Sequence, residues 1–394
     1  MVIEISDRVK RIKPSPTLAV GARAAQLKAE GKDIISLATG EPDFDTPEFI
    51  KDAAIEALHK GFTKYTAVDG TPGLKQAIIN KLKRDNGLTY VPKQICVSVG
   101  AKQALYNLCQ AVLNDGDEVV VPAPYWVSYP DMALIAGAKP VFITAGVDNN
   151  FKITPDQLER AITPKTKIFF LNSPSNPSGK MYTRAELLGL AEVLRKHPQV
   201  IIASDDIYEF IVWHPEGFSN ILNVAPDLED RTVVINGVSK AYAMTGWRIG
   251  YAAGPLNVIA AMTNVQSQST SNPTSISQVA AEAALNGEHD SVKRMCAEFK
   301  KRHDFVYATL SEMSGVKVTP ADGTFYIFPD VSALIKAKGM KNDLEFSEGL
   351  LNDVGVALVP GSAFGSEGCI RISFATSMPV LKDSLERLQR FVGS

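Results

Sequence analysis

Cysteine is scarce in this sequence: there are four among 394 residues, and the two nearest, Cys96 and Cys109, are thirteen positions apart. This spacing excludes a zinc cluster and a dense disulfide framework, so free thiols in a reducing compartment are the simplest interpretation. Long hydrophobic runs are also lacking, since no stretch approaches the roughly 20 apolar residues that span a bilayer. The first residues show no apolar run after their basic residues, unlike a secretory signal. We therefore expect a cytoplasmic protein that does not enter a membrane.

Neither sign of charge is in excess. The chain has 41 Lys and Arg against 43 Asp and Glu, a formal net charge of −2. Because a nucleic-acid binder uses a basic surplus against phosphate, we expect no nucleic-acid partner. Hydrophobic residues make up 45% of the chain, which is ample for a folded core. At roughly 150 residues per domain, the length predicts two or three domains.

The middle of the chain alternates short β-rich runs with longer helical patterns. A strand is expected at residues 95–99, and the helix that follows at 102–113 has apolar residues at helical spacing. Several later runs are almost continuously apolar, as expected for strands covered on both faces of a parallel sheet. We therefore predict a large α/β domain with a mostly parallel central sheet over residues 48–290. The further strand candidates are 118–121, 141–144, 167–171, 200–203, 232–235 and 249–253.

The pattern changes near residue 290, where a long charged amphipathic helix is expected at 291–313. The strands and helices that follow it predict a smaller α+β domain over residues 291–394. The N-terminal residues 1–47 could pack on either domain, and we assign them to the small one. The expected strands are 316–318, 324–327, 355–358 and 369–374, and the expected helices are 343–351 and 379–391.

Polar residues follow several of the predicted strands, where ligands bind in an open α/β sheet. Gly100-Ala101-Lys102 lies between a strand and a helix N-terminus, whose free N–H groups and dipole suit a phosphate. Each such segment alone has an ordinary explanation as a turn, a helix cap or a solvated lysine. Together they provide what a phosphorylated pyridine aldehyde requires. The other segments are Pro124–Trp126, Asn172–Pro177, Asp205–Tyr208 and Asn236–Lys240, with Arg248 eight residues further on.

The segment Lys240–Gly250 resembles the pyridoxal-phosphate lysine segment of the class I aminotransferases. The resemblance covers nearly the whole chain and is closest to bacterial aspartate aminotransferases, which share Lys13-Pro14-Ser15 and Pro124–Pro130. It implies fold type I, pyridoxal 5'-phosphate as cofactor, and a homodimer with active sites at the subunit interface. The implied reaction moves an amino group from aspartate to 2-oxoglutarate by a ping-pong mechanism. The other matching segments are Gly40–Phe44, Lys64-Tyr65, Gly70–Gly73, Asn172–Gly179, Asp205–Tyr208 and Arg371–Ala375.

The resemblance also implies a role for each residue around the cofactor. Lys240 would form the Schiff base and shuttle the proton, and Asp205 would keep the pyridine nitrogen protonated. Tyr208 and Asn176 would hydrogen-bond the cofactor's phenolic oxygen and favour its ionised form. The remaining implied contacts are Trp126 on the ring face and, at the phosphate, the backbone of Gly100, Ala101 and Lys102, the guanidinium of Arg248, and Tyr65 of the other subunit.

For the substrate, the resemblance implies that Arg371 binds the α-carboxylate, with Asn176, Trp126 and the Gly40 backbone nearby. Lys102 has two possible roles. In the most similar relatives a lysine at this position is associated with the distal carboxylate, whereas the alternative is a residue that serves only the phosphate loop. The sequence leaves both roles open.

One position departs from the family pattern. Many relatives have a hydroxyl residue three positions before the lysine, where this chain has Gly237, and Ser239 is a possible substitute. A prephenate or aromatic aminotransferase is the nearest alternative function, because Lys13 could meet a second carboxylate. A silent cofactor-binding module of a transcription regulator is disfavoured, since the chain has no helix-turn-helix region and keeps the full set of site residues. No metal site is expected.

Overall fold

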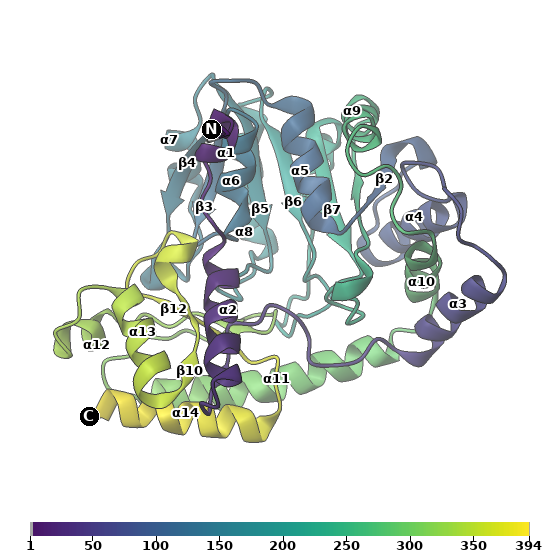
Figure 1. Ribbon diagram of the computed structural model, residues 1–394. Helices are drawn as coiled ribbons and strands as arrows, with labels where there is room; N and C mark the ends of the chain where they lie inside the picture. Colours follow the sequence, from purple (N-terminus) through teal and green to yellow (C-terminus); the bar gives the residue numbers. More distant parts are fainter. Residues whose placement is uncertain (1–2, 394) are drawn as a thin grey trace.

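A computed structural model describes residues 3–393 and contains a seven-stranded sheet between two layers of helices (Figure 1). Six strands point in one direction, and β8 runs antiparallel to both of its neighbours, β2 and β7. The predicted mostly parallel sheet is confirmed. In spatial order the strands are β2 (Ile95–Ser98), β8 (Gly250–Ala253), β7 (Thr232–Gly237), β6 (Ile201–Asp205), β5 (Thr166–Asn172), β3 (Glu118–Ala123) and β4 (Lys139–Thr144).

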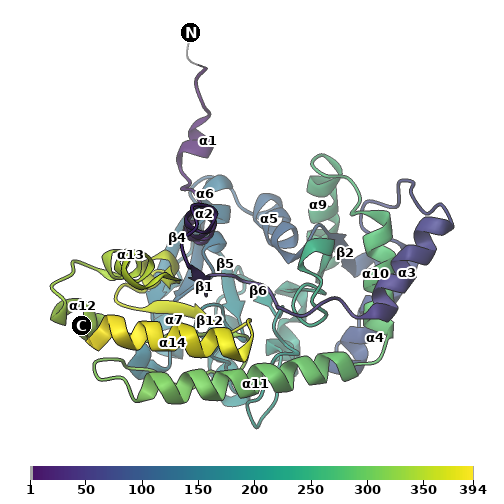
Figure 2. The ribbon, with the colours of Figure 1, turned by 60° about the horizontal axis from the view of Figure 1, so that its bottom comes forward.

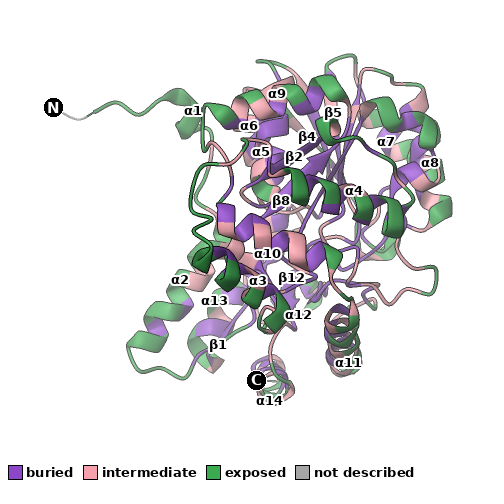
Figure 3. Cartoon of the chain, turned by 90° about the vertical axis from the view of Figure 1, so that its right-hand side faces the viewer, coloured by how far each residue is buried: buried purple, intermediate pink, exposed green. Residues whose placement is uncertain are grey.

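Apolar side chains of each strand alternate between two separate cores. In β3, Val119 and Val121 pack against one helical layer, while Val120 packs against the other. Because both faces are covered, the inner strands are nearly continuous apolar runs and are largely buried (Figure 3), whereas the edge strand β4 is mostly exposed or half-buried. One layer contains α5 (Ala101–Val112), α6 (Ser128–Ile135) and α9 (Leu256–Ser267). The other contains α3 (Glu48–His59), α4 (Pro72–Asn86), α7 (Pro155–Ala161), α8 (Arg184–Arg195) and α10 (Ser275–Asn286).

The C-terminal part of the chain builds a further core along α11 (Asp290–Ser311), the long helix at the bottom of Figure 1. Helix α14 (Met378–Gly393) lies beside α11 (Figure 2), and both pack against an antiparallel three-stranded sheet of order β11-β12-β9. The remaining elements here are β9 (Tyr326–Ile327), α12 (Ser332–Ala337), α13 (Asp343–Val354), β10 (Val356–Ala357), β11 (Val359–Pro360) and β12 (Ile370–Ser373).

The strand predicted at 316–318 is wrong. In the described part of the chain, only Lys317 of this segment pairs, through an isolated bridge to Asp330. The neighbouring strand cannot extend the ladder, because Pro329 has no N–H to donate and Asp330 also bridges to Cys369.

The N-terminal residues contact both parts of the molecule: residues 7–11 begin beside α6 and Asp115, and the segment after them runs along the C-terminal part. Helix α1 (Asp7–Lys10) extends away from the body, and α2 (Pro16–Ala29) lies between the upper and lower halves (Figures 1 and 2). Strand β1 (Ile35–Ser36) pairs in parallel with β10, and Ala24 and Leu27 of α2 pack against Leu351 of α13. No helix among residues 3–393 is long and apolar enough to cross a membrane.

Candidate active site

A cavity of about 620 Å³ opens where the parallel strands end. Strand β5 ends at it with Asn172 and β6 with Asp205, the loop after β7 adds Lys240, and β12 of the other sheet adds Arg371. This volume is in the range that encloses a cofactor-sized ligand. Ten residues predicted from the sequence line this one cavity: Gly40, Ala101, Lys102, Trp126, Asn176, Asp205, Tyr208, Lys240, Arg248 and Arg371.

Three other predicted residues lie outside the cavity lining. Gly100 lies just behind it and has a φ of 78°, a conformation that favours glycine; an added Cβ would also come within 2.4 Å of Arg248 Nη2 and displace the guanidinium. Tyr65 is 93% exposed in the single chain. Lys13 is exposed and does not line the cavity; its backbone lies near the Asp131 carboxyl group of α6.

Lys240 reaches the centre of the cavity from the loop after β7. Its Nζ donates a 2.6 Å hydrogen bond to the Gly40 carbonyl oxygen. Burial lowers the pKa of Lys240 to about 8, and the positive charges of Arg371 and Arg248 act in the same direction. A substantial fraction of this amine is therefore neutral near physiological pH, the form that attacks a carbonyl.

Asp205 faces the same cavity from the end of β6. Its carboxylate accepts a 2.6 Å hydrogen bond from the Tyr129 hydroxyl, and its backbone oxygen accepts one of 2.9 Å from Asn172 Nδ2. Burial raises the pKa of Asp205 to about 6, while the bonds from Tyr129 and the Ile207 N–H oppose this rise. A buried carboxylate of this kind is stabilised by a cationic ring N–H placed against it.

Tyr129 is a functional residue that the sequence reasoning missed. It falls inside the Pro124–Pro130 motif, but no role was assigned to it. The available signal was its proximity in the sequence, because Tyr129 lies in the first turn of α6, three residues after Trp126, and the two rings meet edge-on.

Arg371 comes from β12 and is buried. Its Nη1 donates to Asn176 Oδ1 at 3.0 Å and its Nη2 to the Ala38 oxygen at 2.7 Å, whereas its buried Nε has no hydrogen-bond partner in the described structure. Burial lowers the pKa of Arg371 below its ordinary value. A buried cation with an unused donor that lines a cavity is suited to bind an anion.

Tyr326 was also missed. Its ring lies 4.4 Å from the Arg371 guanidinium, and its hydroxyl accepts a 3.2 Å hydrogen bond from Tyr208. The sequence contained no chemical signal for this residue. Its place follows from the antiparallel register, in which Tyr326 lies opposite Ser373, two residues after Arg371.

The end of the cavity next to α5 fits a phosphate. Ala101 and Lys102 begin α5, and the first N–H groups of a helix have no intrahelical partner. Arg248 adopts a left-handed backbone conformation, with φ of 56°, and donates from Nη1 to the Thr245 oxygen at 2.9 Å. Lys102 Nζ lies 4.9 Å from the Trp126 ring centre, and burial followed by the charge of Arg248 lowers its pKa.

The departure at Gly237 has a steric explanation. A Cβ at this position would come within 2.8 Å of the Ile249 oxygen and 3.0 Å of Gly250 Cα. A hydroxyl residue therefore does not fit here without a backbone shift, whereas Ser239 lines the cavity.

These features match the parts of pyridoxal 5'-phosphate one by one. The α5 N-terminus and Arg248 suit its phosphate, Trp126 its ring face, Asp205 its ring nitrogen and Lys240 its aldehyde carbon. Among residues 3–393, no group of three His, Cys, Asp or Glu side chains could hold a metal ion. The fold and the cavity thus define an α/β enzyme of the pyridoxal-phosphate fold type I.

Comparison with known proteins gives the family. The aminotransferase class I and II family matches residues 32–388. The chain is 57% identical over 392 residues to an aspartate/prephenate aminotransferase of Nitrosomonas europaea, covering 98% of this chain and 99% of that protein. It is similar in structure to an aspartate aminotransferase from Rhizobium meliloti, with a TM-score of 0.96, 48% identity and coverage of 100% and 99%. It is also similar in structure to an aspartate aminotransferase from Thermus thermophilus with maleate, with a TM-score of 0.94 and 42% identity, covering 99% of this chain and 100% of that one.

The chain belongs to the class I and II aminotransferases, and it is an enzyme whose cofactor is pyridoxal 5'-phosphate.

Proposed function

We propose that this enzyme transfers the amino group of aspartate to 2-oxoglutarate, which yields oxaloacetate and glutamate in two half-reactions. The observation that carries this proposal is the meeting of Lys240, Asp205 and Arg371 in one cavity, although they come from two different sheets. The names of the relatives, aspartate aminotransferase and aspartate/prephenate aminotransferase, support the same substrate.

Each of these three groups has a separate task. When bound, pyridoxal 5'-phosphate supplies the sink for the electron pair left when the substrate Cα loses its proton. Lys240 Nζ would hold the cofactor covalently and would move the Cα proton of the substrate, which its lowered pKa favours. The Asp205 carboxylate would hold the proton on the ring nitrogen, and the Arg371 guanidinium, whose Nε has no partner in the described structure, would orient the α-carboxylate of the substrate.

We assign the hydrogen bonds to the phenolic oxygen to Tyr208 and Asn176. The phosphate is assigned to the backbone of Gly100, Ala101 and Lys102 and to the Arg248 guanidinium. Ser239 stands in for the hydroxyl that Gly237 lacks, since Ser239 lines the cavity and a side chain at 237 would meet the backbone of β8.

For the distal carboxylate of aspartate we propose Lys102. Its ammonium lies against Trp126 and lines the cavity, and a dicarboxylate ligand in the Thermus thermophilus relative supports a site for two carboxylates. An anion next to Lys102 would offset the cost of burying its charge, which now lowers its pKa.

Prephenate is a second candidate substrate, and one observation favours it. Leu18, Gly21 and Ala22 of α2 line the cavity, and this small, apolar wall leaves room for a ring. Lys13 precedes the same helix and would meet the further carboxylate if α2 moved over the substrate. Rates with aspartate, prephenate and phenylalanine compare the candidates directly.

We further propose a homodimer in the cytoplasm, in which Tyr65 completes the phosphate site of the other subunit. The exposed ring of Tyr65 and the extended residues before α2 support this assembly, and four unpaired cysteines support a reducing compartment. We also propose that the chain forms a large domain of residues 48–290 and a small domain of residues 1–47 and 291–394. The pairing of β1 with β10 supports placing the N-terminal residues in the small domain.

The test is the absorbance spectrum of the cofactor-loaded protein before and after addition of aspartate. We expect aspartate to convert the visible band to that of the aminated cofactor, and 2-oxoglutarate to restore it. In Lys240→Ala, bound cofactor should remain while steady-state transamination is lost, because one amine carries both the covalent link and the proton transfer. A wild-type spectrum that aspartate leaves unchanged would favour a silent binding module.

A further inference from the structure

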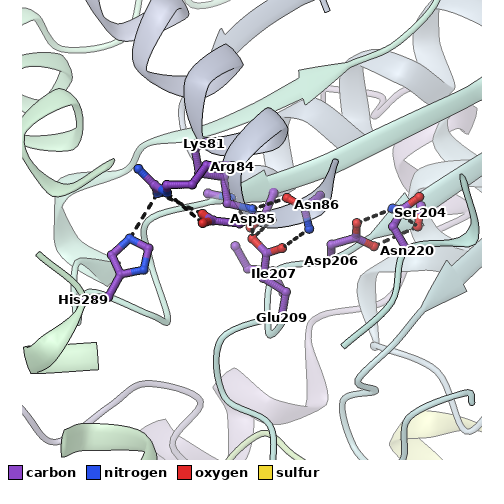
Figure 4. Close-up of polar contacts among 12 residues, drawn as sticks. Lys81, Arg84, Asp85, Asn86, Ser204, Asp206, Ile207, Glu209, Asn220 and His289 are labelled. Carbon is purple, nitrogen blue, oxygen red and sulfur yellow. Dashed lines mark hydrogen bonds and ion pairs between the residues drawn. The ribbon is translucent and has the colours of Figure 1, made fainter. Parts of the chain in front are cut away.

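A buried polar cluster lies between α4, the segment after β6 and the end of β7, next to residues that line the cavity (Figure 4). Its centre is Glu209, which forms an ion pair with Lys81 of α4. Glu209 Oε1 also accepts a 2.6 Å hydrogen bond from Asn236 Nδ2, and Oε2 accepts one of 2.7 Å from Asn86 Nδ2. All four side chains are buried, so these groups exchange hydrogen bonds with one another in place of water.

The segment that carries Glu209 has two functional faces. Asp205 and Tyr208 are three residues apart and line the cavity. Asp206 and Glu209 have the same spacing but do not line the cavity: Glu209 is the centre of the cluster, and Asp206, beside it, accepts a 2.8 Å bond from the Ser204 hydroxyl. The Glu209 N–H donates to the Asp206 oxygen at 2.9 Å, which closes a tight turn between the two faces. A shift of Glu209 would therefore be passed on to Tyr208 and Asp205.

The cluster also reaches the segment that carries the lysine. Asn236 lies near the end of β7, and its Oδ1 accepts a 2.7 Å hydrogen bond from the Gly237 N–H. Lys240 follows three residues later. One carboxylate thus contacts, directly or through a single side chain, both segments that hold the cofactor.

Stability alone is a weak reason for such an arrangement. Burying a carboxylate and an ammonium costs several kcal/mol in desolvation, which the attraction between them offsets only with good geometry, and well-packed apolar groups are often as stable. Hydrogen bonds have defined directions and lengths, whereas apolar contacts do not. A hydrogen-bonded cluster can therefore fix the spacing of two active-site segments better than apolar packing can.

We propose that Glu209 is a positioning residue, which holds the Asp205–Tyr208 segment and the Gly237–Lys240 segment at the spacing that the bound cofactor requires. Lys81 neutralises its charge, and Asn236 makes the link between the two segments. The inference rests on the proposed roles of Asp205, Tyr208 and Lys240 toward the cofactor.

The test compares Glu209→Gln and Asn236→Ala with Arg387→Met. Arg387 forms ion pairs with Asp33 and Asp383, and its side chain is 11% exposed, although the two carboxylate side chains are 82% and 48% exposed. Its replacement therefore removes a mostly buried cation and its ion pairs at residues that do not line the cofactor cavity. Three quantities are measured for each protein: the thermal midpoint without cofactor, the dissociation constant of pyridoxal 5'-phosphate from the apoprotein, and the pH midpoint of the visible band of the loaded protein. None of them needs turnover of aspartate, so they remain readable if the proposed substrate is wrong.

We expect Glu209→Gln and Asn236→Ala to weaken cofactor binding by roughly 10- to 100-fold, the size of effect that a misplacement of about 1 Å produces. Both should also move the pH midpoint of the visible band, whereas Arg387→Met lowers the thermal midpoint only. Lys81→Arg should retain a cofactor affinity near that of wild type, and Lys81→Met should lose it. The titratable groups that face Glu209 are Lys81, Asp206, Tyr242 and Tyr251 of β8. All four are present in wild type, in Glu209→Gln and in Asn236→Ala, so none of them is lost between these proteins.

If Glu209→Gln lowers the thermal midpoint while cofactor affinity and pH midpoint stay within about twofold of wild type, the residue is structural and the proposal is wrong. Should Glu209→Gln fail to fold, Asn236→Ala decides alone, because it removes the two hydrogen bonds that link Glu209 to Gly237 and leaves the Glu209–Lys81 ion pair in place. Unchanged affinity and pH midpoint in folded Asn236→Ala would equally overturn the proposal.

Discussion

The hydroxyl of Tyr129 donates a 2.6 Å hydrogen bond to the Asp205 carboxylate. The Tyr129 ring stacks on Phe170 of β5 at 4.5 Å between centroids and meets Trp126 edge-on at 5.4 Å. The tyrosine is therefore held by aromatic contacts on both sides, and its hydroxyl position is well defined. This bond opposes the rise in the pKa of Asp205 that burial causes.

Replacement of Tyr129 by Phe should raise the pKa of Asp205, because the ionised carboxylate loses a charge-assisted donor worth roughly 1.5 to 3 kcal/mol. The acid limb of kcat/KM should move to higher pH by about one unit. The measurement is the pH profile with aspartate, and Tyr125→Phe on the neighbouring loop serves as the control. An acid limb at the wild-type position would mean that Tyr129 does not control the ionisation of Asp205.

Replacement of Asp205 by Asn should separate stability from function. The pKa of Asp205 is raised from 3.8 to about 6 in the folded protein, so the folded state gains stability below pH 4 and loses it as the pH rises through 6. Asn carries no charge at either pH, so at pH 8 the Asp205→Asn apoprotein should be more stable than wild type by roughly 1 to 3 kcal/mol. Proton removal from the substrate should nevertheless become much slower.

Urea unfolding of the two apoproteins at pH 4 and pH 8 checks the first part of this expectation, and stopped-flow absorbance after aspartate addition checks the second. A stability difference that is the same at both pH values would show that Asp205 ionises with an ordinary pKa. If the absorbance changes at the same rate in Asp205→Asn as in wild type after aspartate addition, Asp205 has only a structural role at the end of β6.

The Lys102→Met substitution tests how the enzyme selects a dicarboxylate. Met keeps most of the side-chain length over Trp126 but removes the charge. If the ammonium meets the distal carboxylate, kcat/KM for aspartate should fall by roughly tenfold or more, while the value for alanine or phenylalanine changes little. If Lys102 serves the phosphate, both values should fall alike and the cofactor should dissociate more readily. The ratio of the two kcat/KM values, at saturating cofactor, distinguishes these outcomes.

Tyr65 permits a test of shared active sites. The Tyr65→Ala and Lys240→Ala proteins should each have little activity at limiting cofactor. In a mixed dimer, however, one site combines an intact Lys240 with an intact Tyr65 from the other subunit. An equal mixture that exchanges subunits should regain up to about a quarter of wild-type activity. Activity that does not rise on mixing, although subunit exchange is demonstrated, would place Tyr65 outside the other subunit's site.

The sequence was informative wherever a local pattern reflected a local physical cause. The apolar runs at 118–121 and 232–235 predicted covered strands, because strands buried on both faces have no polar side to reveal. The match at Lys240–Gly250 predicted the family, which the comparisons confirm. The roles of the individual site residues stay predictions, although the fold brings ten of them to one cavity.

Two features could not be read from the sequence, because each depends on an element elsewhere in the chain. Tyr326 reaches Arg371 only through the register of β9 on β12. The expected strand at 316–318 failed because its partner is interrupted at Pro329, which its own sequence does not reveal.

By itself the sequence determined the α/β class, the order of strands and helices in the chain, and the set of polar residues at the strand ends, since periodicity and motif spacing are properties of short segments. Only the tertiary structure decided the electrostatic state of those residues. The pKa of Lys240 is lowered to about 8 and that of Asp205 is raised to about 6 mainly because packing of the two sheets removes both groups from water. Burial of this kind results from contacts across the whole chain, and no single segment encodes it.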